Sequence, residues 1–408
     1  MDASSAVRAP LILRNRNMFL IWSGQALSQM GTRMYQIALA WWIVSAGGGG
    51  KEVGLFMVAG ALPGLALVKL IGGVVDRHQS RSVLIACDLA AFAVATAVAL
   101  LFAGQRLGFL GACLAGFLLA SAQSFFDPAL NKAVAEAAAR EDLEAAVAFQ
   151  SSTQSLASFG GAVAGALLID RIGILGVIVV NAASYLVSAG LNAGLSLRPA
   201  PPAAAAAPDG SWSAWAALQE TPWLKKVLLG FGCVNFFLTP ILVVLPLYVK
   251  LTLGGSATML GCLEAAVWLG ILGGTFGSRW FPARGGTPGV LRLGAACMLS
   301  LGLCLLLPGL WVQGALFSAA LFGAGFSLGV NNVKFVTLFQ ERVRPELKGR
   351  FFALMQALLS FTFPAAFFLF GLLAEILTPP AVCVIQALGV LALSGYFWRL
   401  SRSKEVAS

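Results

Sequence analysis

Residues 70–103 read LIGGVVDRHQSRSVLIACDLAAFAVATAVALLFA. The stretch closes one apolar run, passes through a short loop with Asp76, Arg77 and Arg81, and enters a second apolar run over 82–103. A helix needs about 20 mainly apolar residues to cross a bilayer. The second run is continuous, whereas a barrel strand alternates and needs only about 10 residues. The stretch therefore predicts membrane-spanning helices that are joined by short charged loops.

The same pattern recurs along the whole chain. Twelve apolar runs are long enough to span a bilayer as helices. They cover 18–45, 53–75, 82–103, 108–130, 146–169, 173–196, 223–250, 257–280, 289–308, 311–337, 350–376 and 379–399. The sequence therefore predicts an all-α polytopic membrane protein with twelve transmembrane helices.

The composition excludes most soluble proteins. Of the 408 residues, 59% are hydrophobic and 11% are charged, whereas a soluble globular protein carries about 25% charged residues. This polar surface is too small for a cytosolic enzyme, a secreted disulfide-rich protein or a disordered chain. The net charge of +10 does not indicate nucleic-acid binding, because the cations lie in short loops and not in one patch. The 7 Cys lie in apolar runs, so we interpret them as buried apolar residues.

The distribution of Lys and Arg predicts the orientation in the membrane. With the N-terminus inside, twenty of the 27 cations fall in cytoplasmic segments. Four fall outside, at Lys51, Arg106, Arg171 and Lys250. Cytoplasmic loops carry an excess of Lys and Arg, so both termini are predicted to be cytoplasmic. The first apolar run is too long for a signal peptide, and we expect a multi-pass protein of the cytoplasmic (inner) membrane.

The middle of the chain separates two similar halves. Residues 198–222 are rich in Pro and Ala and lack apolar periodicity, which is typical of a linker. The segment 127–165 aligns with 331–369, which places Asp127 on Asn331 and Arg140 on Arg344. The sequence therefore predicts two pseudo-symmetric six-helix bundles, at 1–197 and 223–408, joined by a cytoplasmic linker at 198–222.

One face of the first span is polar. Gln25, Gln29, Arg33 and Gln36 follow one another at spacings of 4, 4 and 3, which places them on the same side of a helix. Lipid would leave these side chains unsatisfied, so they face either a cavity or polar neighbours. We expect the stripe to bind substrate, with Arg33 attracting an anionic group or supporting proton coupling. The alternative is that Arg33 pairs with an acid and holds two helices together.

Glu264 is the principal candidate for proton coupling. It lies about two turns into the eighth predicted span, between Leu263 and Ala265. An ionisable group at this depth is costly unless it is paired or hydrated. Three interpretations remain open, namely a proton carrier, a substrate contact and a static pair with Arg33. Asn235, at the position equivalent to Gln29, and Trp268, one turn from Glu264, are further candidates for substrate binding.

Other polar residues lie nearer the cytoplasmic side. Lys69 and Asp88 lie at similar depths in adjacent spans, so we expect them to pair with each other. Asp127, Asn331 and Lys334 lie near the cytoplasmic ends of their spans. A gating role and ordinary solvation at a helix end are equally compatible with these three positions.

The loop GGVVDRHQSR (72–81) resembles the signature of the major facilitator superfamily, Gly-x-x-x-Asp-Arg followed by a basic residue. The resemblance implies a gate in which Gly72 and Gly73 permit close helix contact and Asp76 accepts from a helix N-terminus. Arg77 and Arg81 would pair with acids at the same surface. Gln79 and Ser80 depart from the pattern, and GGTFGSR (273–279) in the second half lacks the acid.

Other stretches resemble the drug and siderophore exporter branch, which includes macrolide efflux proteins and the enterobactin exporter. They are 14–39, FFDPAL (125–130), GCLEAAVWLGILGG (261–274) and 338–358. The chain departs from the branch at Thr32, where an acid is common. The glycine-rich SFGGAVAG (158–165) lacks the proline of the antiporter motif, so Gly160 and Gly165 are interpreted as close-packing positions.

The resemblance implies a monomeric secondary transporter that exports an amphipathic small molecule in exchange for protons, without a cofactor or metal. Two alternatives are a transporter of a lysophospholipid or another lipid-like substrate, and a transporter-like sensor or assembly partner without flux. The sequence lacks a GxxxxGK[ST] loop, so direct use of ATP is not expected. The single His78 lies in a loop, and no catalytic cluster indicates an enzyme.

Overall fold

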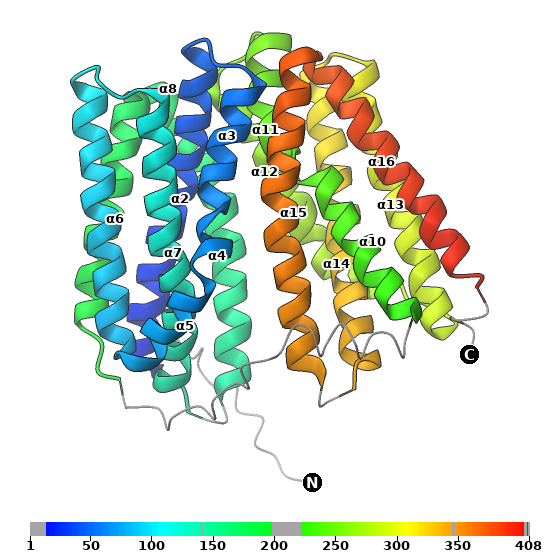
Figure 1. Ribbon diagram of the computed structural model, residues 1–408, viewed down its shortest axis with the longest axis horizontal. Helices are drawn as coiled ribbons and strands as arrows, with labels where there is room; N and C mark the ends of the chain where they lie inside the picture. Colours follow the sequence, from blue (N-terminus) through cyan, green and yellow to red (C-terminus); the bar gives the residue numbers. More distant parts are fainter. Residues whose placement is uncertain (1–13, 140–141, 198–221, 345–346, 404–405, 407–408) are drawn as a thin grey trace. The chain divides into compact units, whose positions relative to one another are not determined.

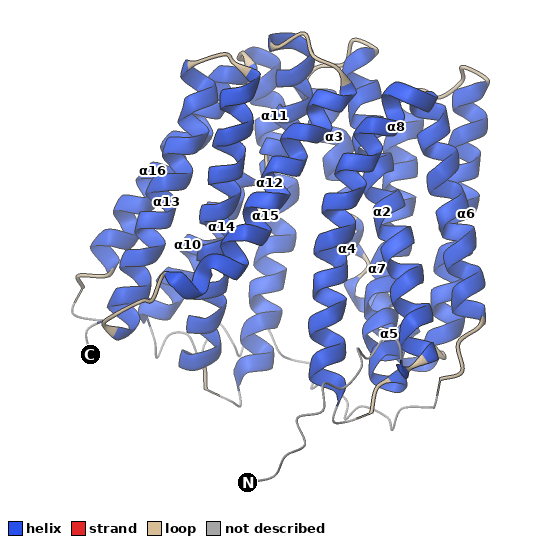
Figure 2. Cartoon of the chain, turned by 180° about the vertical axis from the view of Figure 1, so that it is seen from behind, coloured by secondary structure: helices blue, strands red, loops and turns tan. Residues whose placement is uncertain are grey.

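The computed structural model describes residues 14–139, 142–197, 222–344, 347–403 and 406. Every regular element in these ranges is a helix (Figures 1 and 2). The predicted linker falls outside the described residues except for its last position, Pro222. The all-α prediction is therefore confirmed for the described part of the chain.

The first half contains four long helices and one broken span. The first long helix is α2, and the broken span consists of α3, α4 and α5, which bend by 62°. Pro63 begins α4, and proline cannot donate the backbone hydrogen bond that would continue α3. The bounds are α2 Arg16–Ser45, α3 Gly50–Ala61, α4 Pro63–Ala66, α5 Val68–Arg77, α6 Ser80–Ala103, α7 Phe109–Ala137 and α8 Leu143–Ala193.

Gly173 divides the 51 residues of α8 into two spans. Its φ of 71° and ψ of 175° are not helical, and glycine adopts such a φ because it has no Cβ. Before Gly173, residues later in α8 contact residues later in α2, since Gly161 meets Met30 and Gly165 meets Met34. After Gly173 they run in opposite directions, with Ser188 at Gly24 and Ser184 at Gly31. The two segments are therefore antiparallel, as the predicted spans 146–169 and 173–196 require.

The second half begins with a composite span. Pro246 lies inside α11, and the chain continues as a π-helix, η2. The bounds are α10 Pro222–Leu238, α11 Ile241–Leu247, η2 Tyr248–Thr252, α12 Ala257–Gly277, η3 Ser278–Trp280, α13 Gly286–Leu310, α14 Gly314–Arg342, α15 Lys348–Ile376 and α16 Pro379–Leu400.

The helices account for twelve spans. Among the described residues, nine helices are long and apolar enough to cross a membrane, or ten with the bent pair formed by α3–α4 and α5. The count treats α8 as a single span, although Gly173 divides it, and it omits α2, which carries the polar face. With both included, the predicted number of twelve is reached.

The chain folds into two compact units. One contains Met1–Ala38 and Ala66–Ala205, and the other contains Leu39–Leu65 and Ala206–Ser408. The last part of α2, from Leu39 on, and the first part of the α3–α5 span, up to Leu65, thus belong to the second unit. Below, unit 1 and unit 2 have these meanings, and each is described by itself.

Equivalent helices recur at an offset close to 205 residues. Both bounds of α14 lie 205 residues after those of α7, and both helices contain 29 residues. The first residue of α15 likewise lies 205 residues after that of α8. This offset differs by one residue from the 204 that aligns 127–165 with 331–369 in the sequence.

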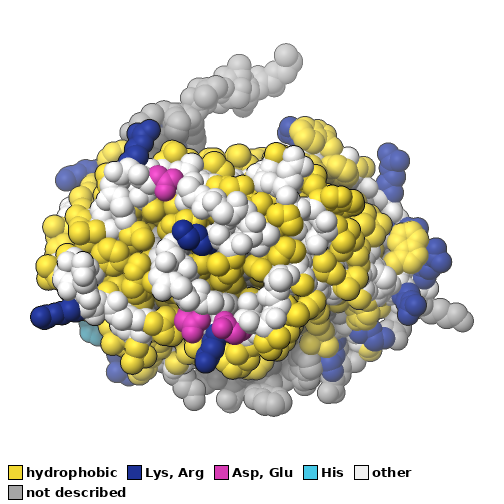
Figure 3. Space-filling model, turned by 90° about the horizontal axis from the view of Figure 1, so that it is seen from above, with side chains coloured by type: hydrophobic (Ala, Val, Ile, Leu, Met, Phe, Trp, Pro, Cys, Tyr) yellow, Lys and Arg dark blue, Asp and Glu magenta, His cyan; other side chains and the backbone are white. Residues whose placement is uncertain are grey.

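The outward-facing side chains are largely apolar. Leu100 is 70% exposed, Phe276 71%, Leu110 79% and Ile376 81%. The end view in Figure 3 shows hydrophobic side chains around the periphery, with Asp and Glu at only a few places on that face. A protein with so much exposed apolar surface would aggregate in water, whereas a lipid bilayer solvates such a surface.

Candidate functional site

The polar face of α2 lies within unit 1. Gln25 is 2% exposed, Gln29 and Arg33 are partly buried, and Gln36 is exposed. Arg33 Nη1 donates to Gln36 Oε1 over 3.2 Å. The Oε1 atoms of Gln25 and Gln29 are buried and accept no hydrogen bond from any residue that the structure describes. Buried polar atoms nearly always have a partner, so these two oxygens are positions where water or a ligand would bind.

A second polar layer joins α2 to the end of α8 and was not predicted from the sequence. Thr32 Oγ1 lies 2.8 Å from Tyr185 Oη and donates to the backbone oxygen of Ser28 over 2.8 Å. An ideal Cβ on Gly31 would overlap Ser184 Oγ and lie 2.8 Å from Asn181 Oδ1, so any larger residue would require these two side chains to move. Thr32 thus contacts a tyrosine hydroxyl.

Asp88 of α6 is held by the same face of α8. Its carboxylate oxygen Oδ2 accepts from Ser188 Oγ and from Asn192 Nδ2, both over 2.8 Å. All three residues are at most 2% exposed. The side chain of Lys69, its predicted partner, lies outside the described part of the structure. Asp88 is thus bound by a hydroxyl and an amide that were not predicted from the sequence.

A sequence signal for this layer was available. Asn181, Ser184, Ser188 and Asn192 follow one another at spacings of 3, 4 and 4, the same criterion that identified the polar face of α2. All four are at most 4% exposed. These side chains are small and neutral, so the pattern is less conspicuous in the sequence than one formed by ionisable groups.

The glycine-rich start of α8 packs closely on α2. An ideal Cβ on Gly161 would lie 2.7 Å from the backbone oxygen of Met30 and 2.8 Å from Arg33 Cβ. One on Gly165 would lie 3.0 Å from Met34 Cα, whereas one on Gly160 would meet Met30 Sδ at an ordinary 3.5 Å. The close-packing interpretation is confirmed for Gly165, and Gly161 contributes more than Gly160.

The signature loop is shorter than predicted, because its residues up to Arg77 belong to α5 and those from Ser80 belong to α6. It is bound within unit 1 through backbone carbonyls. Lys132 Nζ donates to the carbonyl oxygens of Val75 and His78 over 2.9 and 3.0 Å. Arg81 Nη2 donates to the carbonyl of Ala193 over 2.5 Å, where an acidic partner had been expected. Gly72, Gly73, Asp76 and Arg77 are exposed, and no atom of the described chain lies within 4 Å of an ideal Cβ on either glycine.

The other predicted gate residues lie on α7 and α14. Asp127 is partly buried and accepts from Gln123 Nε2 over 2.6 Å. Asn331 is 3% exposed, and its Oδ1 lies 3.3 Å from where a Cβ on Gly294 would be. Lys334 is partly buried on α14. Asp127 and Asn331 thus make different contacts although they are equivalent in the repeat.

The candidate residues of unit 2 lie on α10 and α12. Glu264 is 6% exposed, between the buried residues Leu263 and Ala265. Trp268, one turn later, is partly buried. Asn235 donates through Nδ2 to the carbonyl oxygen of Phe231 over 2.9 Å, within its own helix. A carboxyl group is therefore buried in an apolar helix of unit 2, as the sequence predicted.

Two glycine contacts hold helices of unit 2 together. In the first, an ideal Cβ on Gly54 of α3 would lie 2.7 Å from the backbone oxygen of Phe367 and 2.8 Å from Gly371 Cα, both on α15. Nearby, Glu375 Oε2 accepts from the backbone nitrogen of Lys51 over 3.2 Å. The second contact joins α12 to α14 at Gly270, Gly274, Gly325 and Gly329, where the ideal Cβ atoms would overlap backbone atoms of the opposite helix.

Gly54→Leu is expected to separate α3 from α15, because the added side chain would fall on a backbone that cannot move aside. The cost should be about 2 kcal/mol of unfolding free energy, which a thermal unfolding curve in detergent would show as a lower midpoint. Gly60→Leu is the matched control, since Gly60 lies in the same helix with no atom of the described chain within 4 Å of an ideal Cβ. Equal midpoints for the two variants would contradict the prediction.

Comparisons with known proteins agree with this architecture. Macrolide efflux protein A of Streptococcus pyogenes is 23% identical over 364 residues, which are 88% of this chain and 89% of that protein. The structure of a bacterial homologue of the human lysosomal transporter Spinster has a TM-score of 0.76 at 14% identity, covering 95% of this chain and 97% of that one. A bacterial homologue of the iron transporter ferroportin gives 0.76 at 15% identity, covering 95% and 99%. The nucleoside transporter NupG gives 0.74 at 13% identity, covering 95% and 100%.

At these identities the solved structures show the fold alone. The family follows from the sequence, because the profile of the Major Facilitator Superfamily matches residues 21–367, which is most of the chain. The twelve spans are consistent with the architecture of that family. The chain belongs to the Major Facilitator Superfamily.

Proposed function

We propose that this protein exports an amphipathic small molecule across the cytoplasmic membrane in exchange for protons, by alternating access, with both termini in the cytoplasm. Its family is one of transporters, and a macrolide efflux protein is among its relatives. The substrate would be a drug, a siderophore or a secondary metabolite. Few polar residues in mostly apolar spans suit such a molecule better than a sugar, which needs many hydrogen-bonding side chains.

The polar face of α2 carries the proposal. The buried oxygens of Gln25 and Gln29 accept no hydrogen bond from a described residue. Arg33 and Gln36 follow on the same face of α2, where Arg33 is partly buried and Gln36 is exposed. A bilayer cannot satisfy these groups, so the face requires water or a ligand. Amide oxygens would accept from a substrate hydroxyl or ammonium group, and the Arg33 guanidinium would attract an anionic group. Asn235 and Trp268 are proposed to contribute the same kinds of contact from unit 2.

Glu264 is the proposed proton carrier. Burial opposes the charged form of a carboxyl group, while water or a cation supports it. A carboxyl group that alternates between these surroundings takes up a proton on one side of the membrane and releases it on the other. Substrate contact and pairing with Arg33 are the two other roles that such a group could have.

Reconstituted flux tests the proposed function. A panel of amphipathic antibiotics, including a macrolide, would first be screened by thermal shift, since a ligand of the folded state raises its apparent stability. The binders would then be followed in proteoliposomes with an imposed pH gradient. We expect uphill accumulation that stops when a protonophore removes the gradient. Accumulation that persists with the protonophore would contradict proton coupling, and binding without flux would favour the sensor alternative.

A further inference from the structure

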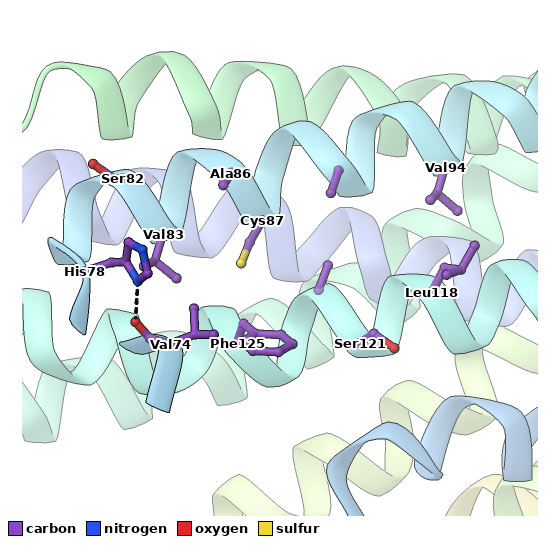
Figure 4. A pocket seen from close by; sticks show the side chains of 12 residues that line it. Val74, His78, Ser82, Val83, Ala86, Cys87, Val94, Leu118, Ser121 and Phe125 are labelled. Atoms are coloured by element: carbon purple, nitrogen blue, oxygen red, sulfur yellow. Dashed lines mark hydrogen bonds between the residues drawn. The ribbon is translucent and has the colours of Figure 1, made fainter. Parts of the chain in front are cut away.

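Unit 1 carries an apolar groove between α5, α6 and α7. Its volume is about 580 Å³. Figure 4 shows side chains from α6 and α7 on its two sides, with His78 at one end and Val94 and Leu118 at the other. Phe125 and Cys87 lie between these ends. The groove is separate from the polar face of α2, because none of its lining residues comes from α2.

The groove has the depth of one lipid leaflet. Ser82 and Val94 both line it, and the helical rise between them is about 18 Å. The hydrocarbon core of a bilayer is about 30 Å thick, so one leaflet occupies about half of that depth. Val74 is 38% and Leu118 42% exposed, so the groove is open at the protein surface.

Polar groups are confined almost entirely to one end of the groove. His78 and Ser82 lie at the end next to the signature loop. The remaining polar lining residue, Ser121, donates to the backbone oxygen of Phe117 over 2.7 Å within its own helix. Along its depth the groove therefore favours a hydrocarbon chain over a polar molecule.

The polar end of the groove is cationic. Arg77 is exposed next to His78, and the Lys132 ammonium group is fixed at this turn by the carbonyl oxygens of Val75 and His78. Arg81 lies one residue before Ser82, and Asp76 is the one acid of the segment 72–81. Arg77, Arg81 and Lys132 thus outnumber the single carboxylate of this segment by three to one. Basic pockets between cytoplasmic helix ends attract anionic lipid headgroups.

We propose that this groove binds one anionic phospholipid of the cytoplasmic leaflet. An acyl chain lies along α6 and α7, and the phosphate is held by Arg77, His78 and Ser82. Because α5 is a short helix after a break, a bound lipid would stabilise it together with the signature loop that it carries. The inference concerns a resident lipid and does not depend on the identity of the transported substrate.

Lipid binding by the purified full chain tests the proposal. Delipidated protein in detergent would be titrated with dioleoyl phosphatidylglycerol or dioleoyl phosphatidylcholine, and bound lipid would be counted by native mass spectrometry. We expect one phosphatidylglycerol to bind more tightly than phosphatidylcholine. Loss of one cation at a membrane surface weakens binding about fivefold, so Arg77→Gln should reduce the affinity for phosphatidylglycerol by about that factor. The affinity for phosphatidylcholine should change little.

A pair of matched double variants locates the acyl chain. Ala86 and Ala90 line the groove and are exposed, so replacing both with Phe should fill it and abolish tight binding. Ala93 and Ala97 are exposed on the same helix with the same spacing but do not line the groove, and their replacement with Phe should leave binding unchanged. Unfolding midpoints would identify a variant that fails to fold, and Arg77→Gln then remains as the test. Equal binding of the two lipids, or undiminished binding by a folded Ala86→Phe and Ala90→Phe variant, would overturn the proposal.

Discussion

Gly274→Leu is expected to lower the unfolding free energy of unit 2 more than any other single substitution considered above. An ideal Cβ on Gly274 would overlap the backbone oxygen of Phe326 and lie 2.8 Å from its carbonyl carbon. Gly329 lies at the same level on the opposite helix. An ideal Cβ on Gly329 would lie 3.1 Å from the carbonyl carbon of Gly274. Neither backbone can give way, so α12 and α14 must separate along their whole contact. We expect a loss of about 3 kcal/mol or more of unfolding free energy.

The neighbouring glycine provides the control for this prediction. An ideal Cβ on Gly273 would meet only the ring of Phe326, at 3.6 Å, which is ordinary contact. Gly273→Ala should therefore be neutral or stabilising by up to about 1 kcal/mol, because alanine favours helix, whereas Gly274→Ala should destabilise. Unfolding can be followed with a thiol-reactive dye once the exposed Cys233 and Cys262 are replaced by Ser, since Cys383 is buried and Cys297 and Cys304 are partly buried in unit 2. The same midpoint for both alanine variants would show that the backbone contact is not tight.

The membrane spans were predictable because their signal is local. An apolar run of about 20 residues specifies a helix whatever its neighbours are, and the predicted span 82–103 differs from α6, Ser80–Ala103, by two residues at one end only. The division of α8 was also predictable, since Gly173 starts the predicted sixth span. The α12–α14 contact has a local signal as well, because Gly270 and Gly274, like Gly325 and Gly329, are separated by three residues. That spacing predicts close packing, but it does not say against which helix.

The side-chain partners were less predictable because they depend on how neighbouring helices are rotated. Depth alone suggested a pair between Lys69 and Asp88, which the described side chains do not test, and it gave no hint that Asp88 accepts from Ser188 and Asn192, about one hundred residues later in the chain. Arg81 was expected to meet an acid and instead binds the carbonyl of Ala193 at the end of α8. A backbone carbonyl has no signature in the sequence. Neutral partners such as Ser, Asn and carbonyl groups are therefore the ones that reasoning from charges overlooks.

Glu264→Gln is expected to abolish accumulation driven by the pH gradient while leaving downhill substrate exchange intact. Glutamine keeps the size of the side chain but cannot take up or release a proton. Glu264 is 6% exposed within an apolar stretch of α12, so the neutral amide should be tolerated there at least as well as the carboxyl group. Uphill transport and exchange would be measured in the same proteoliposomes, with and without the gradient.

Glu341→Gln makes the same chemical change at an exposed position of α14 and should leave both activities unchanged.

The effects of Glu264→Gln on uphill transport and on exchange distinguish the roles proposed for Glu264. A proton carrier is needed only for the uphill reaction, so its loss spares exchange. If Glu264 contacts the substrate, exchange fails together with uphill transport and substrate binding weakens. If it serves only as a partner of Arg33, the Arg33→Gln and Glu264→Gln double variant should recover stability that each single variant loses. Undiminished uphill transport by Glu264→Gln would remove this carboxyl group from the coupling mechanism.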